Sequence, residues 1–502
     1  MQNKILLATV SAFFILHSAF GQGALTPPGA PAPTMKTLAQ IEPRIAIAAA
    51  PFTISSSGSY YLTTNVSVSS GDAITIATNG VTLDLNGFTI SSTAASAAGN
   101  GIFLGGSNPK DITILNGHIQ SGVTNNGSGV FNGSGFANGI YYGNLPVNVL
   151  VSKVSVSGCL SSGINLNTGD ATTVEGCTVR TMGFVGITAT TVKGCEAIDC
   201  GGYGIIATQV SDSRGVSASA GGAGISATTA QNCYGQSTGN GSGILATTAQ
   251  NCYGSSFGNG AGIGVTIALN CYGFSLGNGA GIGVTIALNC YGFSLGNGAG
   301  IGATTAQNCF GYSVNASGFH LNDGGTLTGC SASSSVTGIT AGNRCTIKDC
   351  AASNNSTNGI MVGQSCRVSG CIASENGTGT TGIGISVGIR TTVENCTVND
   401  NRGDGLLASG DCTVLNNHTS HNGLGIAGAA GIHATGAGSR IDGNHTRDNS
   451  GYGIKSDGGA GADTIVRNTS GGNGTAQYSP TTGTTFAPVQ TPATMTNPSA
   501  NF

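Results

Sequence analysis

The chain has 502 residues and a formal net charge of −3, with 86 glycines, no tryptophan and only 7% charged residues. Its length exceeds what one globular core sustains, so we expect either several domains or a solenoid, which grows by stacking. The small net charge gives no long-range field, which argues against nucleic acid and anionic membrane surfaces as main partners.

The first 21 residues are predicted to be a signal peptide. Lys4 precedes an apolar run from Ile5 to Phe20, and Ala19-Phe20-Gly21 has the small-x-small form of a cleavage site. The run is shorter than the roughly 20 residues of a membrane-spanning helix. The sequence therefore predicts export to a secreted, periplasmic or cell-surface location, with no integral membrane segment once the signal is removed.

Internal repetition dominates the rest of the chain. The 19-residue unit GAGIGVTIALNCYGFSLGN occurs twice in succession, at 260–278 and 279–297, and degenerate copies extend in both directions. After Cys195 the repeated position falls near Arg214. The position is otherwise marked by Cys159, Cys177, Cys195, Cys233, Cys252, Cys271, Cys290, Cys309, Cys330, Cys350, Cys371 and Cys396, and then by Asn417, Asn444 and Asn468.

Two further rows of residues predict short strands in every unit. Three positions before the Cys/Asn residue the chain carries Val156, Val174, Val192, Ala230, Ala249, Ala268, Ala287, Ala306, Leu327, Ile347, Val368, Val393, Val414, Ile441 and Ile465. Charged residues such as Glu175 and Lys193 flank this row, which is the alternation of a strand with one wet face. Pairs of glycine and an apolar residue, from Gly139-Ile140 to Gly453-Ile454, mark a second strand that follows a turn.

Units of 19 to 25 residues with short strands and no helical period predict an all-β fold, a single-stranded parallel β-helix (solenoid) of about 16 coils. We expect the coils to occupy 45–474, preceded by an extended lead-in at 22–44 and followed by a Pro/Thr-rich C-terminal tail at 475–502. An asparagine ladder is predicted from Asn355, Asn376, Asn401, Asn422, Asn449 and Asn473, which recur five positions after the Cys/Asn residue.

These coils, together with GVTLDLNGFTI at 80–90, resemble the secreted bacterial right-handed parallel β-helix repeat proteins of the pectin-lyase-like superfamily. The resemblance covers roughly 50–474 and implies a right-handed solenoid. Many members bind or cleave acidic or complex polysaccharides and others have no assigned activity, so the resemblance indicates architecture rather than chemistry.

The sixteen cysteines allow two interpretations. In an exported protein they can form disulfides between neighbouring coils, where Cα atoms come within bonding range. Alternatively, the twelve at the shared position form a buried row of free thiols. Cys345 and Cys366 share another position and are a second candidate pair. No spacing matches a CxxC metal site, so no structural zinc is expected.

The C-terminal coils carry the best candidate site. Glu375, Asp400, His421 and Asp448 lie four positions past the Cys/Asn residue on consecutive coils, so they should line up at steps of about 4.8 Å. Such a column can supply a general acid and base for a sugar ring, or bind Ca²⁺ through its carboxylates. His418 and His445, one position past the same residue, are candidate metal ligands together with Asp448. The alternative is a solvated turn column, since turns collect Asp and Asn for local reasons.

Other residues offer weaker candidates. Residues 215–322 contain no Asp, Glu, Lys or Arg, so these coils are expected to be scaffold rather than a site of acid–base chemistry. Asp400, Arg402 and Asp404 form an N-R-G-D-G segment that also fits a turn. Asp84 and His118 are isolated and are expected to be structural. The outward pairs of the central strands, such as Thr229 with Gln231, form an uncharged face on which a neutral glycan or another protein fits.

Two functional hypotheses follow. The first is an exported, non-catalytic β-helix that binds carbohydrate or acts as a surface or structural element, with extracellular polysaccharide or cell-surface components as partners. The second is a polysaccharide lyase or glycoside hydrolase acting through the C-terminal coils. The uncharged centre and the lack of a match to lyase or glycosidase signatures favour the first. No cofactor is expected under the first hypothesis, and Ca²⁺ is the candidate under the second.

Overall fold

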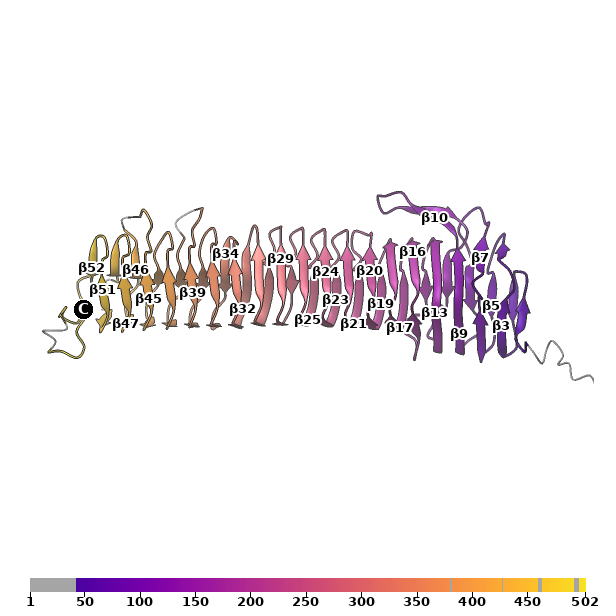
Figure 1. The fold of residues 1–502 in the computed structure, drawn as a ribbon, viewed down its shortest axis with the longest axis horizontal. Helices are drawn as coiled ribbons and strands as arrows, with labels where there is room; N and C mark the ends of the chain where they lie inside the picture. Colours follow the sequence, from indigo (N-terminus) through magenta and orange to yellow (C-terminus); the bar gives the residue numbers. More distant parts are fainter. Residues whose placement is uncertain (1–41, 380–381, 427, 459–462, 492–495) are drawn as a thin grey trace, which may run out of the picture. The chain divides into compact units, whose positions relative to one another are not determined.

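A computed structural model describes residues 42–379, 382–426, 428–458, 463–491 and 496–502. The chain divides into two units, Met1–Ile45 and Ala46–Phe502. The predicted signal peptide and nearly all of the predicted lead-in lie outside the described residues. The second unit is a stack of parallel strands wound into successive rungs (Figure 1), and no helix occurs among its described residues.

Three rows of strands run along the stack, and the parallel pairings define their register. Sheet 1 extends from β2 (Phe52–Ile54) to β52 (Ala476–Ser479), sheet 2 from β3 (Gly58–Leu62) to β53 (Thr485–Phe486), and sheet 3 from β4 (Val66–Val68) to β51 (Thr469–Gly471). These rows confirm the parallel β-helix. They contain about 20 rungs, close to the 16 coils counted from the Cys/Asn position.

The additional rungs lie where the marker residue is missing. At the start of the stack β2, β5 (Ile74–Ile76) and β8 (Asn100–Leu104) precede the first marked coil. At its end β52 pairs with β49 (Tyr452–Ser456), and β53 pairs with β50 (Thr464–Val466). The last rung therefore draws its strands from the Pro/Thr-rich segment after residue 474.

An antiparallel hairpin interrupts the early rungs. Its strands are β10 (Gly122–Asn125) and β11 (Phe131–Ser134). The Asn125 side-chain amide donates to Asp199 at 2.6 Å, and the Phe131 ring is buried. The hairpin consequently lies against rungs that come much later in the chain, above the stack in Figure 1.

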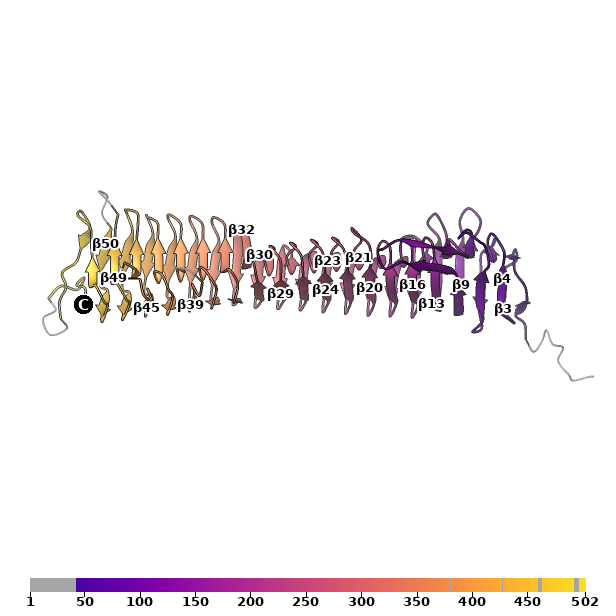
Figure 2. The same ribbon diagram turned by 90° about the horizontal axis from the view of Figure 1, so that it is seen from above.

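The core is built from rows in which successive rungs carry the same buried side chain. The isoleucines of the Gly-Ile pairs stack inside sheet 1, for example Ile244, Ile263 and Ile282, which are fully buried. Opposite them sheet 3 presents glycine: a Cβ placed on Gly254 would approach Cγ1 of Ile263 to 2.5 Å. Because the isoleucine side chains of sheet 1 face glycines of sheet 3, the two sheets approach closely. The central rungs are therefore narrow, as Figure 2 shows between β21 (Ile225–Gln231) and β30 (Ile301–Gln307).

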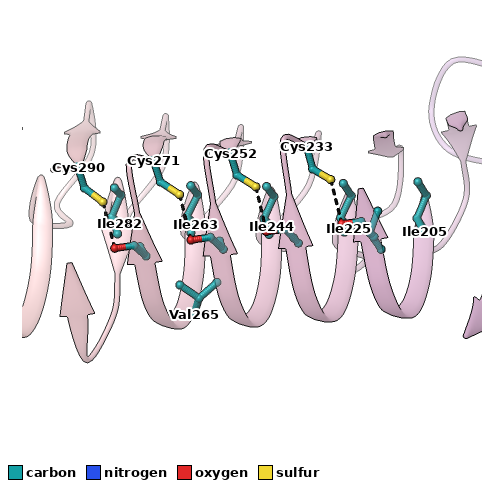
Figure 3. Close-up of a cluster of buried hydrophobic side chains, with 14 of the residues drawn as sticks. Ile205, Ile225, Cys233, Ile244, Cys252, Ile263, Val265, Cys271, Ile282 and Cys290 are labelled. Atoms are coloured by element: carbon teal, nitrogen blue, oxygen red, sulfur yellow. Dashed lines mark hydrogen bonds between the residues drawn. The ribbon is translucent and has the colours of Figure 1, made fainter. Parts of the chain in front are cut away.

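The buried cysteines form a hydrogen-bonded row rather than a mere apolar filling. In the central rungs the thiols donate to a carbonyl of the preceding rung, such as Cys271 to Ala249 at 3.4 Å and Cys290 to Ala268 at 3.4 Å (Figure 3). Several sulfur atoms also accept from a backbone N–H, as where the Cys290 N–H donates to Sγ of Cys309 at 3.3 Å. All sixteen cysteines are free and buried, which matches the thiol interpretation.

The register corrects three positions in the repeat. Val151, not Val156, pairs with Val174, and Cys159 pairs with Met182 in a different row. The reason is the continuous strand β13 (Val147–Cys159), which spans sheets 2 and 3 so that Val154 occupies the turn. The rung after Cys195 carries Ser213, whose hydroxyl accepts the Cys195 N–H at 3.1 Å, rather than Arg214.

In the C-terminal rungs, asparagine side chains form the hydrogen bonds between neighbouring rungs, in two parallel ladders. In the predicted ladder, Asn401 donates to Oδ1 of Asn422 at 2.8 Å and accepts the Asn376 side chain at 2.8 Å and its backbone N–H at 3.1 Å. A second ladder continues the cysteine row through Asn417, Asn444, Asn468 and Asn501. Both ladders are buried.

Substituting a ladder asparagine should therefore be costly. Asn401→Ala leaves the buried N–H of Asn376 without its acceptor, and we expect a loss of about 2–4 kcal/mol of unfolding free energy. The matched control is Asn297→Ala, because Asn297 donates to Asn278 at 2.9 Å in an exposed row. Urea denaturation measures both; equal effects of the two substitutions would contradict a structural role for burial.

The thiols give a second prediction. All sixteen cysteines are buried inside the stack, so their sulfur atoms are shielded from reagents in solution. We expect a thiol-specific reagent to modify almost no cysteine in the native protein and all sixteen after denaturation without reductant. A shortfall in the denatured count would show that neighbouring rungs are joined by disulfides.

Candidate functional site

One row of outward-facing residues runs along sheet 3, and we call it the outer column. It consists of the residue directly after the stacked Cys/Asn position. Strand pairing aligns Thr178, Glu196, Arg214, Tyr234, Tyr253, Tyr272, Tyr291, Phe310, Ser331, Ala351, Ile372, Thr397, His418, His445 and Thr469.

The outer column is fixed by the turn that precedes it. In the central rungs each turn consists of an asparagine in the left-handed conformation followed by the buried cysteine, as at Asn251 and Asn270, both with φ of 52°. Asparagine tolerates this conformation better than most residues. The asparagine side chain therefore points outward beside the tyrosine of the same rung.

A groove of about 1020 Å³ lies along this turn. From Asn232 onward its lining carries no charged side chain and consists of the asparagines, cysteines and tyrosines of successive rungs. At its N-terminal end lie Glu196, Asp212 and Arg214. Arg214 forms an ion pair with Glu196 at 2.8 Å, and its guanidinium lies 5.3 Å from the Tyr234 ring centre. The tyrosine row therefore ends at a charged group.

The tyrosines form a continuous stack. Ring centres of Tyr234, Tyr253, Tyr272 and Tyr291 are 4.9–5.1 Å apart, and neighbouring rings are within 5° of parallel. The ring faces consequently contact one another, whereas the ring edges and hydroxyls face outward. Burial raises the pKa of Tyr253, and the neighbouring Tyr234 raises it further, which keeps this hydroxyl a neutral donor.

The asparagines beside them form an exposed amide row. Asn251 donates to Oδ1 of Asn232 at 3.2 Å, and Asn270 donates to Oδ1 of Asn251 at 3.1 Å. A side-chain amide has two donor hydrogens and an oxygen with two lone pairs. The row uses one of each per rung, which leaves one donor and one acceptor on every rung for a ligand.

The predicted acid–base column is a column of turn residues. Glu375, Asp400, His421 and Asp448 have φ of 57°, 58°, 55° and 54° and directly precede the buried asparagine ladder. Their strands are in register, so they do lie on consecutive rungs. The local preference of turns for Asp and Asn therefore accounts for their position.

Glu375 and Asp400 share a cavity. Glu375 and Asp400 line a pocket of about 430 Å³ together with Arg402, Thr378 and Leu424. Asp448 instead accepts from Arg447 at 3.1 Å. Consecutive rungs are about 4.8 Å apart, which is close to the carboxyl separation of about 5–5.5 Å in retaining glycosidases.

The two predicted histidine ligands lie side by side in the outer column. Nδ1 of His418 and Nδ1 of His445 are 3.0 Å apart, and the ring centres are 4.8 Å apart. Burial lowers the pKa of His418, with further lowering by His445 and His421. Among the described residues no group of three or more His, Cys, Asp or Glu is placed to hold a metal ion.

An ion cluster on sheet 1 was missed by the sequence analysis. His433 bonds Asp404 through Nδ1 at 2.9 Å and Asp457 through Nε2 at 2.9 Å. Lys455 bonds Asp457 at 2.6 Å. Both ring nitrogens face carboxylates on neighbouring rungs, which favours the protonated imidazole. His433 and Lys455 each follow a Gly-Ile pair, and reading that position along the repeat would have placed them on consecutive rungs.

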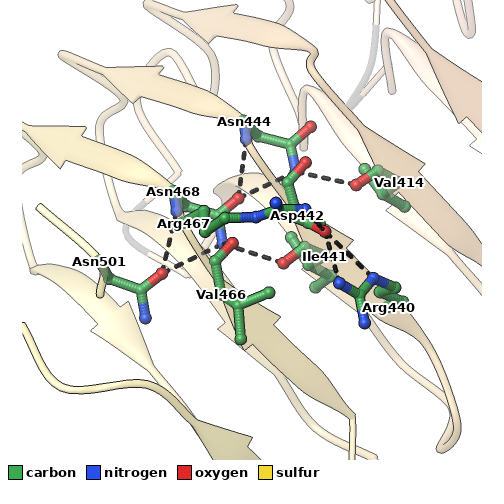
Figure 4. Close-up of polar contacts among 9 residues, drawn as sticks. All are labelled: Val414, Arg440, Ile441, Asp442, Asn444, Val466, Arg467, Asn468 and Asn501. Atoms are coloured by element: carbon green, nitrogen blue, oxygen red, sulfur yellow. Dashed lines mark hydrogen bonds and ion pairs between the residues drawn. The ribbon is translucent and has the colours of Figure 1, made fainter. Parts of the chain in front are cut away.

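A second ion cluster lies on sheet 2 (Figure 4). The Asp442 carboxylate is 3% exposed and accepts from Arg440 at 2.7 Å and from Nε of Arg467 at 2.7 Å. Arg467, and then Arg440, hold the pKa of Asp442 below its usual range. Both guanidinium groups are about half exposed, so they shield the carboxylate from water at the C-terminal end of the stack.

The remaining residues that the sequence analysis singled out lie apart from these clusters. Asp84 accepts the backbone N–H of Asn86 at 2.8 Å, as in a turn. His118 lines a separate pocket of about 390 Å³ with Lys153, and its strand position aligns with the start of the outer column. Thr229 and Gln231 are both exposed, as expected from strand alternation.

The fold identifies the class of protein. Residues 291–473 match the family model described as "Right handed beta helix region". This match confirms the resemblance to right-handed β-helix proteins, so the described unit is a right-handed parallel β-helix. No curated protein matches the chain, and no helix among the described residues is long and apolar enough to span a membrane.

Solved structures give faint similarities. The A-module of mannuronan C-5 epimerase AlgE4 from Azotobacter vinelandii is 13% identical, with 84% of this chain and 88% of that chain covered and a TM-score of 0.22. The AlgE6 A-module of the same organism is 13% identical, with 86% and 92% covered and a TM-score of 0.19. DFA-IIIase from Arthrobacter chlorophenolicus is 12% identical, with 84% and 87% covered and a TM-score of 0.17. These values carry no information on activity.

The His433 cluster predicts a pH-dependent stability. Burial alone would lower the pKa of His433, but the bonds to Asp404 and Asp457 outweigh it and raise the pKa above the ordinary 6.5. A raised pKa contributes stability that is complete below the ordinary value and is lost as the pH rises through the folded-state value.

We therefore expect His433→Asn to lower the thermal midpoint more at pH near 6 than at pH near 9. The control is His320→Asn, because His320 is exposed on the same outer face of sheet 1. A pH-independent difference between the wild type and His433→Asn would show that the imidazole packs as a neutral group.

Proposed function

We propose that this protein is an exported, non-catalytic solenoid that binds a neutral polysaccharide along the Asn-Tyr groove of its central rungs. The observation that carries the proposal is the repeated pairing of one outward asparagine and one tyrosine on each rung of a groove of about 1020 Å³. Export rests on the N-terminal sequence alone.

The chemistry of the groove suits a hydroxyl-rich ligand without charge. The amide row offers a donor and an acceptor on each rung, and the tyrosine hydroxyls add another polar group at the same spacing. The tyrosine ring faces are occupied by the neighbouring rings, so the tyrosines offer a ligand their hydroxyls and ring edges rather than a stacking surface. An anionic ligand would find a partner only at Arg214, beside two carboxylates.

The repetition of the groove favours a polymer. Asn251 with Tyr253, Asn270 with Tyr272 and Asn289 with Tyr291 form equivalent subsites, one on each rung. A chain with a matching repeat engages several subsites at once, so weak contacts add up to useful affinity. General acid–base chemistry needs titratable groups near the ligand, and residues 215–322 contain no Asp, Glu, Lys or Arg.

The test is binding of the purified protein to soluble neutral and uronic-acid oligosaccharides by titration calorimetry. We expect binding of a neutral glycan that is insensitive to salt and strengthens with oligosaccharide length. Tyr253→Phe/Tyr272→Phe keeps the ring stack and removes two hydroxyls, and should weaken binding by about tenfold, or 1.4 kcal/mol.

The matched control is Thr229→Ala/Thr248→Ala, which changes another outward row and should leave binding unchanged. Failure of every neutral glycan to bind, or equal binding by the Phe variant, would contradict the proposal.

A second candidate function is a polysaccharide lyase or glycoside hydrolase. The observation favouring it is the pocket in which Glu375, Asp400 and Arg402 lie together. Two carboxylates on adjacent rungs suit acid–base or nucleophilic attack on a glycosidic bond, and a guanidinium suits a uronate. New reducing ends or unsaturated product from the same glycans, lost in Asp400→Asn, would establish it; no turnover leaves the binding function.

A further inference from the structure

The outer column contains a pair of histidines that the proposed glycan groove does not include. His418 begins β45 (His418–Ser420), and His445 begins β48 (His445–Arg447), the strand paired with it. Their Nδ1 atoms are 3.0 Å apart, and the rings are tilted by 59°. The groove lining ends at Tyr291, several rungs earlier.

The scaffold holds these two rings in place before any ligand arrives. Each histidine directly follows a buried ladder asparagine, and Asn417 donates to Oδ1 of Asn444 through its side chain at 3.0 Å and through its backbone at 2.8 Å. The ladder therefore fixes where both strands begin. Neither ring can move away by a shift in register, since Thr419 and Thr446 are buried on the inner face of the same strands.

The distance between the nitrogens matches a specific coordination geometry. Imidazole nitrogens lie about 2.0–2.1 Å from a divalent metal ion. Two such ligands at a right angle are then about 2.8–3.0 Å apart, whereas two at the tetrahedral angle are about 3.3–3.4 Å apart. The observed separation of 3.0 Å fits adjacent corners of a square-planar or octahedral site.

We propose that His418 and His445 form a two-histidine site for a divalent transition metal ion that prefers right-angled coordination, Cu²⁺ or Ni²⁺, with both Nδ1 atoms as ligands. Such geometry with nitrogen ligands is characteristic of these ions. Each neutral ring then carries its proton on Nε2, so binding requires no net loss of a proton. Water or an external ligand completes the coordination sphere.

The surrounding charges favour the neutral rings that coordination requires. Burial, and then the proximity of His445 and His421, lower the pKa of His418. Asp448, the third ligand predicted from the sequence, has its carboxylate bonded to Arg447 at 3.1 Å. The site therefore consists of two protein ligands and stays open to a further molecule.

The experiment uses the full chain purified without a polyhistidine tag. Titration calorimetry with Ni²⁺ should give one equivalent of binding, and electron paramagnetic resonance of the Cu²⁺ form should show two nitrogen ligands. We expect His418→Gln and His445→Gln each to weaken Ni²⁺ binding by at least about tenfold. Thermal melting in the presence of a chelator verifies that both variants fold.

The matched control is His320→Gln, which removes an exposed histidine on sheet 1 and should leave the affinity unchanged. Absence of stoichiometric Ni²⁺ binding would mean that the two rings merely share a proton, and would overturn the proposal. A single nitrogen in the Cu²⁺ spectrum, or an equal loss in His320→Gln, would overturn the assignment of the ligands.

Discussion

The structure depends on one requirement: the backbone N–H at each turn of a rung needs an acceptor inside the stack. The chain meets it with a side chain from the next rung. The acceptor is Sγ in the row through Cys290 and Cys309, Oγ at Ser213 and Oδ1 in the row through Asn417 and Asn444. Cysteine, serine and asparagine thus replace one another at a single position because each is small and has an acceptor at the right distance.

The same turn determines what faces outward. The residue before each buried acceptor adopts the left-handed conformation, and the residue after it starts a strand with its side chain in the outer column. A substitution at this repeat position therefore always changes a side chain of the outer column. The tyrosine row, Arg214 and the histidine pair are three segments of the outer column, distinguished by which residue each repeat carries there.

Sequence periodicity was sufficient to predict the strands, the parallel register and the asparagine ladder, because these depend on inward residues that recur every rung. It misplaced Cys159 by five positions, since the long strand β13 replaces the usual turn and moves the cysteine into another row. The histidine pair could be aligned from the sequence because both residues share one repeat position. The His433 cluster was missed although its members also recur in register: Asp404 directly precedes one Gly-apolar pair and His433 directly follows the next, but the sequence analysis did not read along these positions. The groove was missed for a related reason: concavity is a property of the angle between two sheets and not of any single row.

Asn501 and Phe502 pair with the last strand of sheet 3. Asn501 continues the buried ladder beyond Asn468, and Phe502 exchanges backbone hydrogen bonds with Asn468 and Ser470 at 2.8 and 2.6 Å. An uncovered terminal rung would present unpaired strands to any second molecule and would serve as a template for end-to-end growth. By occupying those backbone groups of sheet 3, Asn501 and Phe502 leave them unavailable for pairing with a further strand at that edge.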